Sequence, residues 1–366
     1  MHKWYVLAGE ASGDLHGSNL VKAMKAMKPE LQFRGIGGDQ MKAAGVHLVK
    51  HIRETNFMGF VEVVMNLPTI WQLFSLVEAD ILRYQPDAVI LIDYPGFNLR
   101  LAKFLKQKGI PVHYYISPQL WAWKKGRIKT IRECVDRLYC ILPFEKDFYA
   151  KEGLEVDYVG HPLLDALASQ MVQPLFDKPV IALLPGSRKQ EISKMLPVML
   201  ETVKAFPAET FVVAGAPTQE EAFYRQFLKP YPNVQLVQNQ TYPLLASAKA
   251  ALVTSGTATL ETALWNVPEV VCYAGGWLSF QIAKRIVDIS YISLVNLILD
   301  RPAVTELIQD DLSAANLIQR LQYLLSDSGR EQTLADYAEL RTKLGGGGAS
   351  ANAATLMLNR VYPSVN

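Results

Sequence analysis

Short apolar runs alternate with amphipathic stretches along most of the chain. In the first half, six runs have the length and the β-branched and aromatic residues of strands: WYVLAG, LQFRGI, DAVILID, PVHYYIS, RLYCIL and VDYVG. Helical patterns lie between them, for example at residues 18–27 and 98–108. The second half repeats the arrangement with the runs VIALLPG, TFVVAG, NVQLV, AALVTSG and EVVCYAG. Strands that alternate with helices form parallel sheets covered by helices, so the pattern predicts an α/β fold.

A loop-like segment with three prolines, residues 161–179, separates the two series of strands. The separation predicts two doubly wound, Rossmann-like domains that face each other across a cleft, one over residues 1–170 and one over residues 171–344. Beyond residue 296 the pattern is helical only, until the glycines at 345–348 interrupt it before a last short helix. We expect residues 345–366 to pack back on the N-terminal domain or to be exchanged between the subunits of a homodimer.

Composition and charge exclude some classes of protein and are consistent with the predicted fold. The chain has 366 residues, enough for two domains, and its net charge of +2 gives no electrostatic footprint for general nucleic-acid binding. Its three cysteines form no C-x-x-C pair and lie in or near apolar runs, which is typical of a cytoplasmic protein. No window of 18 uninterrupted apolar residues occurs, so we expect a soluble or peripheral protein and not an integral one.

The first strand ends in a glycine-rich turn, AGEASGD, that leads into a helix. Such a turn usually brings the backbone close to a phosphate or a sugar. Its spacing is not G-x-G-x-x-G, and it contains two acids, Glu10 and Asp14, so it departs from the dinucleotide fingerprint. The alternatives to a ligand-binding role are that Asp14 is a helix N-cap and that Glu10 is a solvated loop charge.

Two strand ends in the second half have residues that suit a phosphate. LLPGSR places Gly186, Ser187 and Arg188 just past the carboxyl end of one strand. LVTSGTATLE places an SGT turn past another, at the start of a helix; its residues are Ser255, Gly256 and Thr257. Ligands of open α/β sheets bind at such ends, where helix N-termini offer N–H groups and arginine offers a permanent cation. The pattern therefore predicts a diphosphate site, and the alternative for the SGT turn is a simple N-cap.

Common motifs for metals and dinucleotides are missing from the chain. It has no P-loop, no complete dinucleotide fingerprint, no G-x-S-x-G, no H-E-x-x-H and no Asp-x-Asp pair that would hold a metal on a nucleotide sugar. We therefore expect no cofactor and no metal. The charge of a diphosphate would be neutralised by arginine, helix ends and backbone N–H groups.

Nine motifs occur in order along the chain: AGEASGD, MGFVEV, DYPGFN, SPQLWAW, LPFEKDFY, VGHPLLD, LLPGSR, TSGTATLE and SLVNLIL. With them, nearly the whole chain resembles the lipid-A-disaccharide synthase family, glycosyltransferases of the two-Rossmann-domain class called GT-B. The resemblance implies an inverting transferase that condenses UDP-2,3-diacylglucosamine with 2,3-diacylglucosamine 1-phosphate (lipid X). The products would be the lipid A disaccharide 1-phosphate and UDP, in lipid A biosynthesis of Gram-negative bacteria.

For the N-terminal domain, the resemblance implies the acceptor site and the catalytic base. The loop of Glu10, Ser12, Gly13 and Asp14 would face the reacting sugars, with Glu10 as a catalytic candidate. Asp93 ends the strand DAVILID, matches the aspartate considered catalytic in the family, and would take a proton from the acceptor 6-hydroxyl. Where other members have Asp-Phe-Asn, this chain has Gly-Phe-Asn, which removes a second nearby carboxylate. The alternative for Asp93 is a cap of the turn YPGFN.

For the C-terminal domain, the resemblance implies the UDP site. Arg188 matches the essential arginine of the Gly-Ser-Arg motif and would compensate charge on the diphosphate. Glu261 would hold the ribose hydroxyls, because two acceptor oxygens suit a vicinal diol. Its alternative is a surface acid in the first helical turn. Asn296 in SLVN matches a functional asparagine of the family, with a helix N-cap as the alternative.

The acylated substrates imply contact with a membrane, and one apolar stretch suits it. From Phe57 to Phe74, large apolar residues recur mostly at three- and four-residue steps. We expect its outward face, with Val64, Leu67 and Trp71, to make a peripheral contact on the cytoplasmic side of the inner membrane. The alternative is an ordinary buried helix.

Two functions from other classes share parts of this pattern. A sugar-nucleotide epimerase of similar fold would share the UDP site but would need no lipid acceptor, and the apolar stretch argues against it. A non-catalytic nucleotide-sugar or lipid carrier would bind the same ligands without chemistry, and the presence of Asp93 together with Arg188 argues against that.

Overall fold

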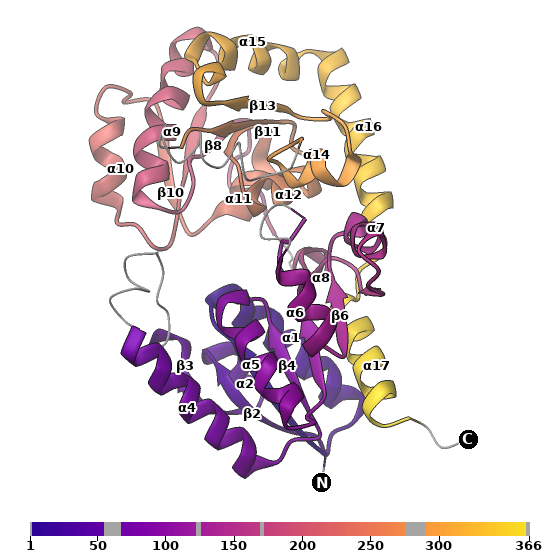
Figure 1. Ribbon diagram of the computed structural model, residues 1–366. Coiled ribbons are helices and arrows are strands. Elements are labelled where there is room, and N and C mark those ends of the chain that lie inside the picture. The colour runs from indigo at the N-terminus through magenta and orange to yellow at the C-terminus, as the bar shows by residue number, and fades with distance from the viewer. Residues whose placement is uncertain (1, 55–66, 122–125, 169–171, 276–289, 364–366) are drawn as a thin grey trace. The chain divides into compact units, whose positions relative to one another are not determined.

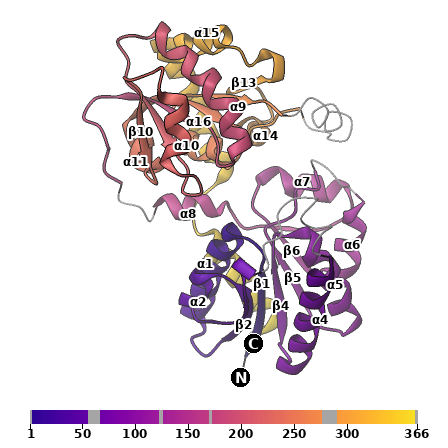
Figure 2. The same cartoon turned by 90° about the vertical axis from the view of Figure 1, so that its left-hand side faces the viewer.

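The two series of strands form two separate parallel sheets, as Figure 1 and Figure 2 show. The computed structural model describes residues 2–54, 67–121, 126–168, 172–275 and 290–363. Two compact units make up the chain: unit 1 comprises Met1–Ala168 and Gly346–Asn366, and unit 2 comprises Ser169–Gly345. The predicted α/β class, with a doubly wound sheet in each half, is confirmed.

Among the described residues, the sheet of unit 1 has seven parallel strands in the order β3-β2-β1-β4-β5-β6-β7. Their bounds are β1 (Lys3–Ala8), β2 (Gln32–Gly37), β3 (Val46–His51), β4 (Ala88–Ile92), β5 (Val112–Tyr115), β6 (Arg137–Cys140) and β7 (Asp157–Tyr158). Helices cover both faces, so a central strand is apolar throughout, and every residue of β4 is buried. The strand order reverses between β1 and β4, and ligands of such sheets bind at the carboxyl ends next to a reversal.

Alternate strand residues of unit 1 face two different helical layers. Tyr5 and Leu7 share a core with α4 (Leu67–Tyr84), α5 (Pro95–Gln107), α6 (Arg127–Cys134) and α7 (Pro143–Lys151). Trp4 and Val6 share the opposite core with α1 (Ala11–Met27), α2 (Asp39–Ala43) and α17 (Ala349–Val361). A short 3-10 helix, Ile52–Glu54, follows β3.

The first helix begins earlier than the sequence predicts. We expected a glycine-rich loop before a helix at residues 18–27, but α1 begins at Ala11 and contains Gly13 and Gly17. A Cβ atom on Gly17 would lie 2.8 Å from the sulfur of Met41 and 2.9 Å from Cδ1 of Ile92. Glycine is tolerated inside this helix because it lets the helix lie close against the sheet. The residues that look like a loop in the sequence are therefore the first turns of α1.

The C-terminal helix α17 packs on unit 1 of its own chain (Figure 1), where it contacts α1. Its Met357 is fully buried. Asp165 in α8 (Pro162–Ala168) accepts a hydrogen bond from the backbone N–H of Gly348, where α17 begins. The amide of Asn352 donates to the carbonyl oxygen of Val159 at 3.1 Å. Hydrogen bonds thus hold the start of α17 in place, and apolar contacts hold the rest of the helix against unit 1.

Unit 2 has six parallel strands among its described residues, in the order β10-β9-β8-β11-β12-β13. Their bounds are β8 (Val180–Leu184), β9 (Phe211–Gly215), β10 (Gln235–Gln238), β11 (Ala248–Thr254), β12 (Glu269–Tyr273) and β13 (Thr305–Ile308). The helices are α9 (Lys189–Glu201), α10 (Glu221–Leu228), α11 (Thr241–Ser247), α12 (Thr257–Leu264), α14 (Leu294–Leu299), α15 (Ala314–Leu325) and α16 (Asp327–Leu344). The strand order reverses between β8 and β11, as it does between β1 and β4 in unit 1.

One element of unit 2 contradicts the helical pattern expected beyond residue 296. Strand β13 lies there and pairs with β12, residue Val270 opposite Thr305. The prediction failed because β13 has only four residues, TELI, of which only Leu307 is buried. A run this short has no periodicity that distinguishes it from the neighbouring helices.

Candidate functional site

The candidate residues of unit 1 lie where β1 and β4 end side by side. Ala8 pairs with Ile92 in the sheet, so Gly9 and Asp93 are the first residues beyond the two strands. A Cβ atom on Gly9 would overlap the ring of Tyr94, which shows how closely the two turns pack. The register therefore brings Glu10 and Asp93, predicted from separate motifs, to one edge of the sheet.

The backbone at Asp93 is in an unusual conformation. Asp93 and Tyr94 have φ values of 44° and 47°, in the left-handed region that residues other than glycine rarely adopt. Such conformations persist only where surrounding contacts enforce them, and they are concentrated at functional sites. The strained backbone of the turn after β4 costs free energy, and chain packing alone does not require such a conformation.

Two buried side chains hold this turn in place. The amide of Asn98 donates to the carbonyl oxygens of Asp93 at 2.7 Å and of Ile92 at 3.1 Å. The hydroxyl of Tyr114 donates to the same carbonyl oxygen of Asp93 at 2.5 Å. Both side chains are fully buried. Sequence reasoning missed both, although Asn98 is the last residue of the quoted motif DYPGFN and Tyr114 lies in the predicted strand PVHYYIS.

The carboxyl group of Asp93 has a pKa raised to about 6. Burial is the main cause, the negative charge of Glu10 adds to it, and a hydrogen bond from the backbone N–H of Tyr94 opposes it. A carboxylate with a pKa close to neutrality is a better proton acceptor than an ordinary aspartate and is still ionised at pH 7. The alternative of a simple turn cap does not account for burial beside a second acid.

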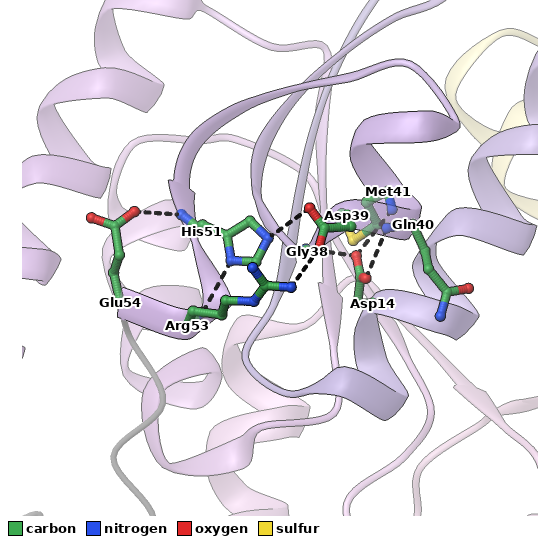
Figure 3. Close-up of polar contacts among 8 residues, drawn as sticks. All are labelled: Asp14, Gly38, Asp39, Gln40, Met41, His51, Arg53 and Glu54. Carbon is green, nitrogen blue, oxygen red and sulfur yellow. Dashed lines mark hydrogen bonds and ion pairs between the residues drawn. The ribbon is translucent and has the colours of Figure 1, made fainter. Parts of the chain in front are cut away.

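Asp14 has a structural role, which Figure 3 shows. Its carboxylate accepts hydrogen bonds from the backbone N–H groups of Gly38 at 2.6 Å, Met41 at 3.0 Å and Gln40 at 3.1 Å. These are the free N–H groups at the start of α2, so Asp14 caps a helix, although it caps α2 and not the helix in which it lies. The expectation that Asp14 faces a sugar is therefore wrong. Glu10 is at the N-cap position of α1, and its side chain makes no capping hydrogen bond.

In unit 2, the candidate nucleotide residues line one cavity of about 420 Å³. It lies at the carboxyl ends of β8, β9 and β11, next to the reversal of strand order. Seven of the eight predicted UDP-binding residues line it: Gly186, Ser187, Arg188, Ser255, Gly256, Thr257 and Glu261. Two loops separated by some 70 residues of sequence, GSR and SGT, thus meet at one place.

Glycines give both loops backbone conformations that other residues rarely adopt. Gly186 and Gly256 have φ values of 102° and 154°, and a side chain at either position would be strained. Gly256 is at the N-cap position of α12, where no side chain makes a capping hydrogen bond. Ser255 instead donates to the carbonyl oxygen of Ile292 at 3.0 Å. The alternative, in which the SGT turn serves only to cap its helix, is therefore not what the contacts show.

Glu261 is oriented within this cavity by a neighbour. The hydroxyl of Tyr242 donates to Oε1 of Glu261 at 2.7 Å. Burial raises the pKa of Glu261, and the hydrogen bond from Tyr242 opposes the shift. Glu261 is thus a half-buried acceptor and not the exposed acid of the alternative interpretation. Tyr242, in α11, was not predicted from the sequence.

Asn296 lies outside the cavity and is fully engaged in local structure. Its side chain is buried in α14 and donates to the carbonyl oxygen of Val304 and to Oε1 of Glu306, both at 2.9 Å. Its amide oxygen accepts from the backbone N–H of Val304 at 2.9 Å. Ser293, not Asn296, caps α14. The structure therefore does not bring Asn296 together with the other predicted UDP-binding residues.

Two of the three predicted membrane-contact residues, Leu67 and Trp71, lie in the first turns of α4. Trp71 is 54% exposed, and the guanidinium of Arg100 lies 3.7 Å from the centre of its ring. Val64 lies outside the described residues, as does the side chain of Leu67. No helix within the described ranges is long and apolar enough to cross a membrane.

Known proteins match this chain over nearly its whole length. The family model described as lipid-A-disaccharide synthetase matches residues 4–359. The lipid-A-disaccharide synthase of Myxococcus xanthus is 39% identical, over 98% of this chain and 97% of its own length. That of Syntrophus aciditrophicus is 40% identical, over 98% of each chain.

Solved structures with low sequence identity share the fold. UDP-GlcNAc 2-epimerase from Neisseria meningitidis bound to UDP-GlcNAc has a TM-score of 0.65 at 14% identity, covering 99% of each chain. CalG4, the calicheamicin glycosyltransferase, has a TM-score of 0.63 at 18% identity, also covering 99% of each chain. The residues that the family model matches include Asp93 and Arg188 and the other candidate residues beside them. The chain therefore belongs to the lipid-A-disaccharide synthase family.

Proposed function

We propose that this chain transfers the diacylglucosaminyl group of UDP-2,3-diacylglucosamine to 2,3-diacylglucosamine 1-phosphate, with Asp93 as the general base. The products are the lipid A disaccharide 1-phosphate and UDP. The observation that carries the assignment of the base is the environment of Asp93, a half-buried carboxyl group with a pKa of about 6 on a turn with strained backbone. Family membership supports the reaction, and this geometry supports the role of the residue.

The acceptor 6-hydroxyl attacks the anomeric carbon of the donor sugar as Asp93 takes its proton. The bond between that carbon and the UDP oxygen breaks, and UDP leaves with the electron pair. Attack on the face opposite the leaving group inverts the anomeric configuration. Asn98 and Tyr114 keep the carbonyl group of Asp93 fixed, which orients its carboxylate. The charge of Glu10 favours the protonated form of Asp93 once the proton has been taken.

Unit 2 holds the leaving group in this proposal. Negative charge grows on the diphosphate as the bond breaks, and Arg188 with the N–H groups of the two glycine-containing loops stabilises it. Glu261 accepts hydrogen bonds from the ribose hydroxyls, oriented by Tyr242. Asn296 acts indirectly, by fixing the segment between α14 and β13.

The acyl chains of both substrates place the enzyme on the cytoplasmic face of the inner membrane. The exposed ring of Trp71 supports this contact, because aromatic residues favour the interface between lipid and water. Arg100, stacked on that ring, adds a cation that attracts anionic head groups.

One assay tests the proposed reaction. The purified protein is incubated with UDP-2,3-diacylglucosamine, with and without the acceptor, and the products are analysed by mass spectrometry and NMR. We expect disaccharide 1-phosphate with inverted anomeric configuration and an equal amount of UDP, only when the acceptor is present. An altered donor sugar without acceptor would indicate an epimerase, and a bound but unchanged donor would indicate a carrier.

A further inference from the structure

The carboxylate of Glu191 lies where the candidate diphosphate site offers its donors. Glu191 is in the first turn of α9, directly after the GSR loop. Its Oε2 accepts hydrogen bonds from the backbone N–H groups of Ser187 and Arg188, both at 3.3 Å. Its Oε1 is 2.8 Å from Nη1 of Arg188. One carboxylate thus engages two backbone N–H groups and a guanidinium at once, the donors that a phosphate group takes in protein sites.

The loop is shaped around this carboxylate. A Cβ atom on Gly186 would lie 2.8 Å from Oε2 of Glu191 and 3.0 Å from its Cβ, and the φ value of 102° at Gly186 also excludes a side chain without strain. The hydroxyl of Thr218 and the amide of Gln219 donate to the carbonyl oxygen of Ser187 at 3.0 and 3.1 Å. These contacts hold the N–H groups of the loop in one orientation. The donors are therefore already aligned on an internal anion before a ligand arrives.

This arrangement is weak enough to be exchanged for a ligand. The side chains of Arg188 and Glu191 are 74% and 32% exposed, and exposed ion pairs contribute little stability. The N–H contacts are at the long end of the hydrogen-bond range. Both side chains also line the cavity of unit 2, so a ligand in that cavity meets them directly.

We infer that Glu191 is a resident counter-anion, which competes with the diphosphate of the nucleotide for Arg188 and for the N–H groups of the GSR loop. The inference rests on the proposed function, since it takes that cavity as the diphosphate site. A diphosphate must displace the carboxylate and is then repelled by its charge. The competition lowers the affinity for bound UDP and so assists its release after transfer. A ligand without the uridine contacts displaces the carboxylate less readily.

The test is the affinity for UDP of the variant Glu191→Gln, measured by titration calorimetry. Glutamine keeps the size of the side chain and an oxygen that can accept from the loop, but removes the charge. We expect the Kd for UDP to fall roughly three- to tenfold, the range expected for loss of one exposed charge pair. The inhibition constant of UDP as a product should fall by the same factor. Inorganic pyrophosphate, the second probe, should also bind more tightly to the variant.

Two controls make the result specific. Glu201→Gln removes the same charge from an exposed residue at the other end of α9, and it should leave the Kd unchanged. In the double variant Arg188→Ala/Glu191→Gln, the gain in affinity relative to Arg188→Ala should be smaller than the gain of the single variant, because the contested cation is gone and only the contested N–H groups remain. A thermal melt of each variant shows that the unit remains folded.

An unchanged or higher Kd in a folded Glu191→Gln protein would overturn the inference and would mean that Glu191 only caps α9 or orients Arg188. Such a result leaves the proposed transfer reaction standing, since the parent protein still binds UDP. If the parent protein itself does not bind UDP, the cavity has been assigned wrongly, and both this inference and the nucleotide part of the proposed function fail.

Discussion

The two units place their candidate residues at equivalent positions of their sheets but build opposite environments there. In unit 1, the edge beside the strand reversal holds two acids, Glu10 and Asp93, and the second is half-buried on a turn of strained backbone. In unit 2, the equivalent edge holds glycine-containing loops, helix N-termini and Arg188 around a cavity. The first environment raises the pKa of a carboxyl group, and the second attracts an anion.

This difference shows what each kind of site needs from the fold. A half-buried carboxylate on a strained turn requires contacts that fix the turn, and the buried side chains of Asn98 and Tyr114 provide them. An anion site requires only backbone N–H groups at the right angle, which glycine turns supply without burial. We therefore expect proton transfer to depend on unit 1 and nucleotide affinity to depend on unit 2, and substitutions can separate the two.

The largest effect is expected in unit 1. Asp93→Asn removes the proton acceptor but keeps the shape of the side chain, so kcat for disaccharide formation should fall by about 10²- to 10⁴-fold. Steady-state assays at saturating donor and acceptor measure it. A variant with near-normal kcat would remove Asp93 from the mechanism and with it the chemical role of unit 1.

A smaller effect, of a different kind, is expected in unit 2. Arg188→Ala removes a charged hydrogen-bond donor from the diphosphate site, so the affinity for UDP should fall by roughly 10- to 100-fold. Arg188→Lys should restore only part of it, because a single ammonium cannot reproduce the planar guanidinium. Titration calorimetry with UDP checks both variants. If Arg188→Ala binds UDP as tightly as the parent protein, the anion site of unit 2 is misplaced.

Membrane contact should also belong to unit 1. Burial of a large aromatic side chain contributes roughly 1.5–3 kcal/mol, so Trp71→Ser should weaken binding to anionic vesicles by about tenfold or more. Tyr323→Ser is the matched control, since Tyr323 in unit 2 is 47% exposed and Trp71 is 54% exposed. Vesicle flotation measures binding, and a thermal melt measures folding. Equal losses of flotation in the two variants would contradict the assignment to unit 1.

Unit 2 also contains a buried acid, Glu269. It lies at the amino end of a strand, whereas Asp93 follows the carboxyl end of one. Glu269 begins β12, and neither of its carboxyl oxygens has a hydrogen-bond partner among the described residues. Burial, and then the charge of Glu306, raise its pKa well above the usual range. The folded protein holds this proton while the unfolded chain releases it, so the free energy of unfolding falls as the pH rises above about 4.5.

Glu269→Leu removes this dependence. The variant should be more stable than the parent protein at pH 8, and its advantage should grow with pH by up to about 1.4 kcal/mol per pH unit. Urea unfolding between pH 5 and 8 measures the difference, and the affinity for UDP should be unchanged. A stability difference that is constant with pH would mean that Glu269 is not held protonated.

The smallest effect concerns the coupling of the two acids in unit 1. Because the base must be ionised, kcat/KM should fall as the pH falls through about 6, the pKa of Asp93. Glu10→Gln removes the nearby negative charge, which lowers that pKa, so the acid limb of the profile should move to lower pH. It should remain above the position for an ordinary aspartate, because burial is the larger cause. A limb that does not move would mean that Glu10 and Asp93 are not coupled.

The sequence predicted the parts of this account that depend on local patterns. Apolar runs such as DAVILID identify β4, and glycine with arginine past a strand end identifies the cavity of unit 2. It could not predict the contacts made across the fold. The capping of α2 by Asp14 joins residues 24 to 27 positions apart in sequence, and Tyr114 reaches Asp93 over 21 positions.

Residue type and motif also misled where a residue has two uses. Gly13 was expected in a loop, because glycine is rare within helices, but tight packing of α1 on the sheet favours it there. Asn296 matched a motif of the family, yet its side chain is engaged by Val304 and Glu306. A motif identifies a position in the fold, and only the contacts distinguish a ligand-binding residue from one that supports the site.

The most direct test of the division between the units is the affinity of the Asp93→Asn protein for UDP, measured by titration calorimetry on the sample whose kcat has been determined. If unit 1 supplies the base and unit 2 binds the nucleotide, the Kd for UDP should equal that of the parent protein within about twofold, a small difference on the affinity scale, while kcat is lost. A Kd that rises in parallel with the loss of kcat would contradict the account, because it would mean that Asp93 contributes to nucleotide binding and that the two environments do not act separately.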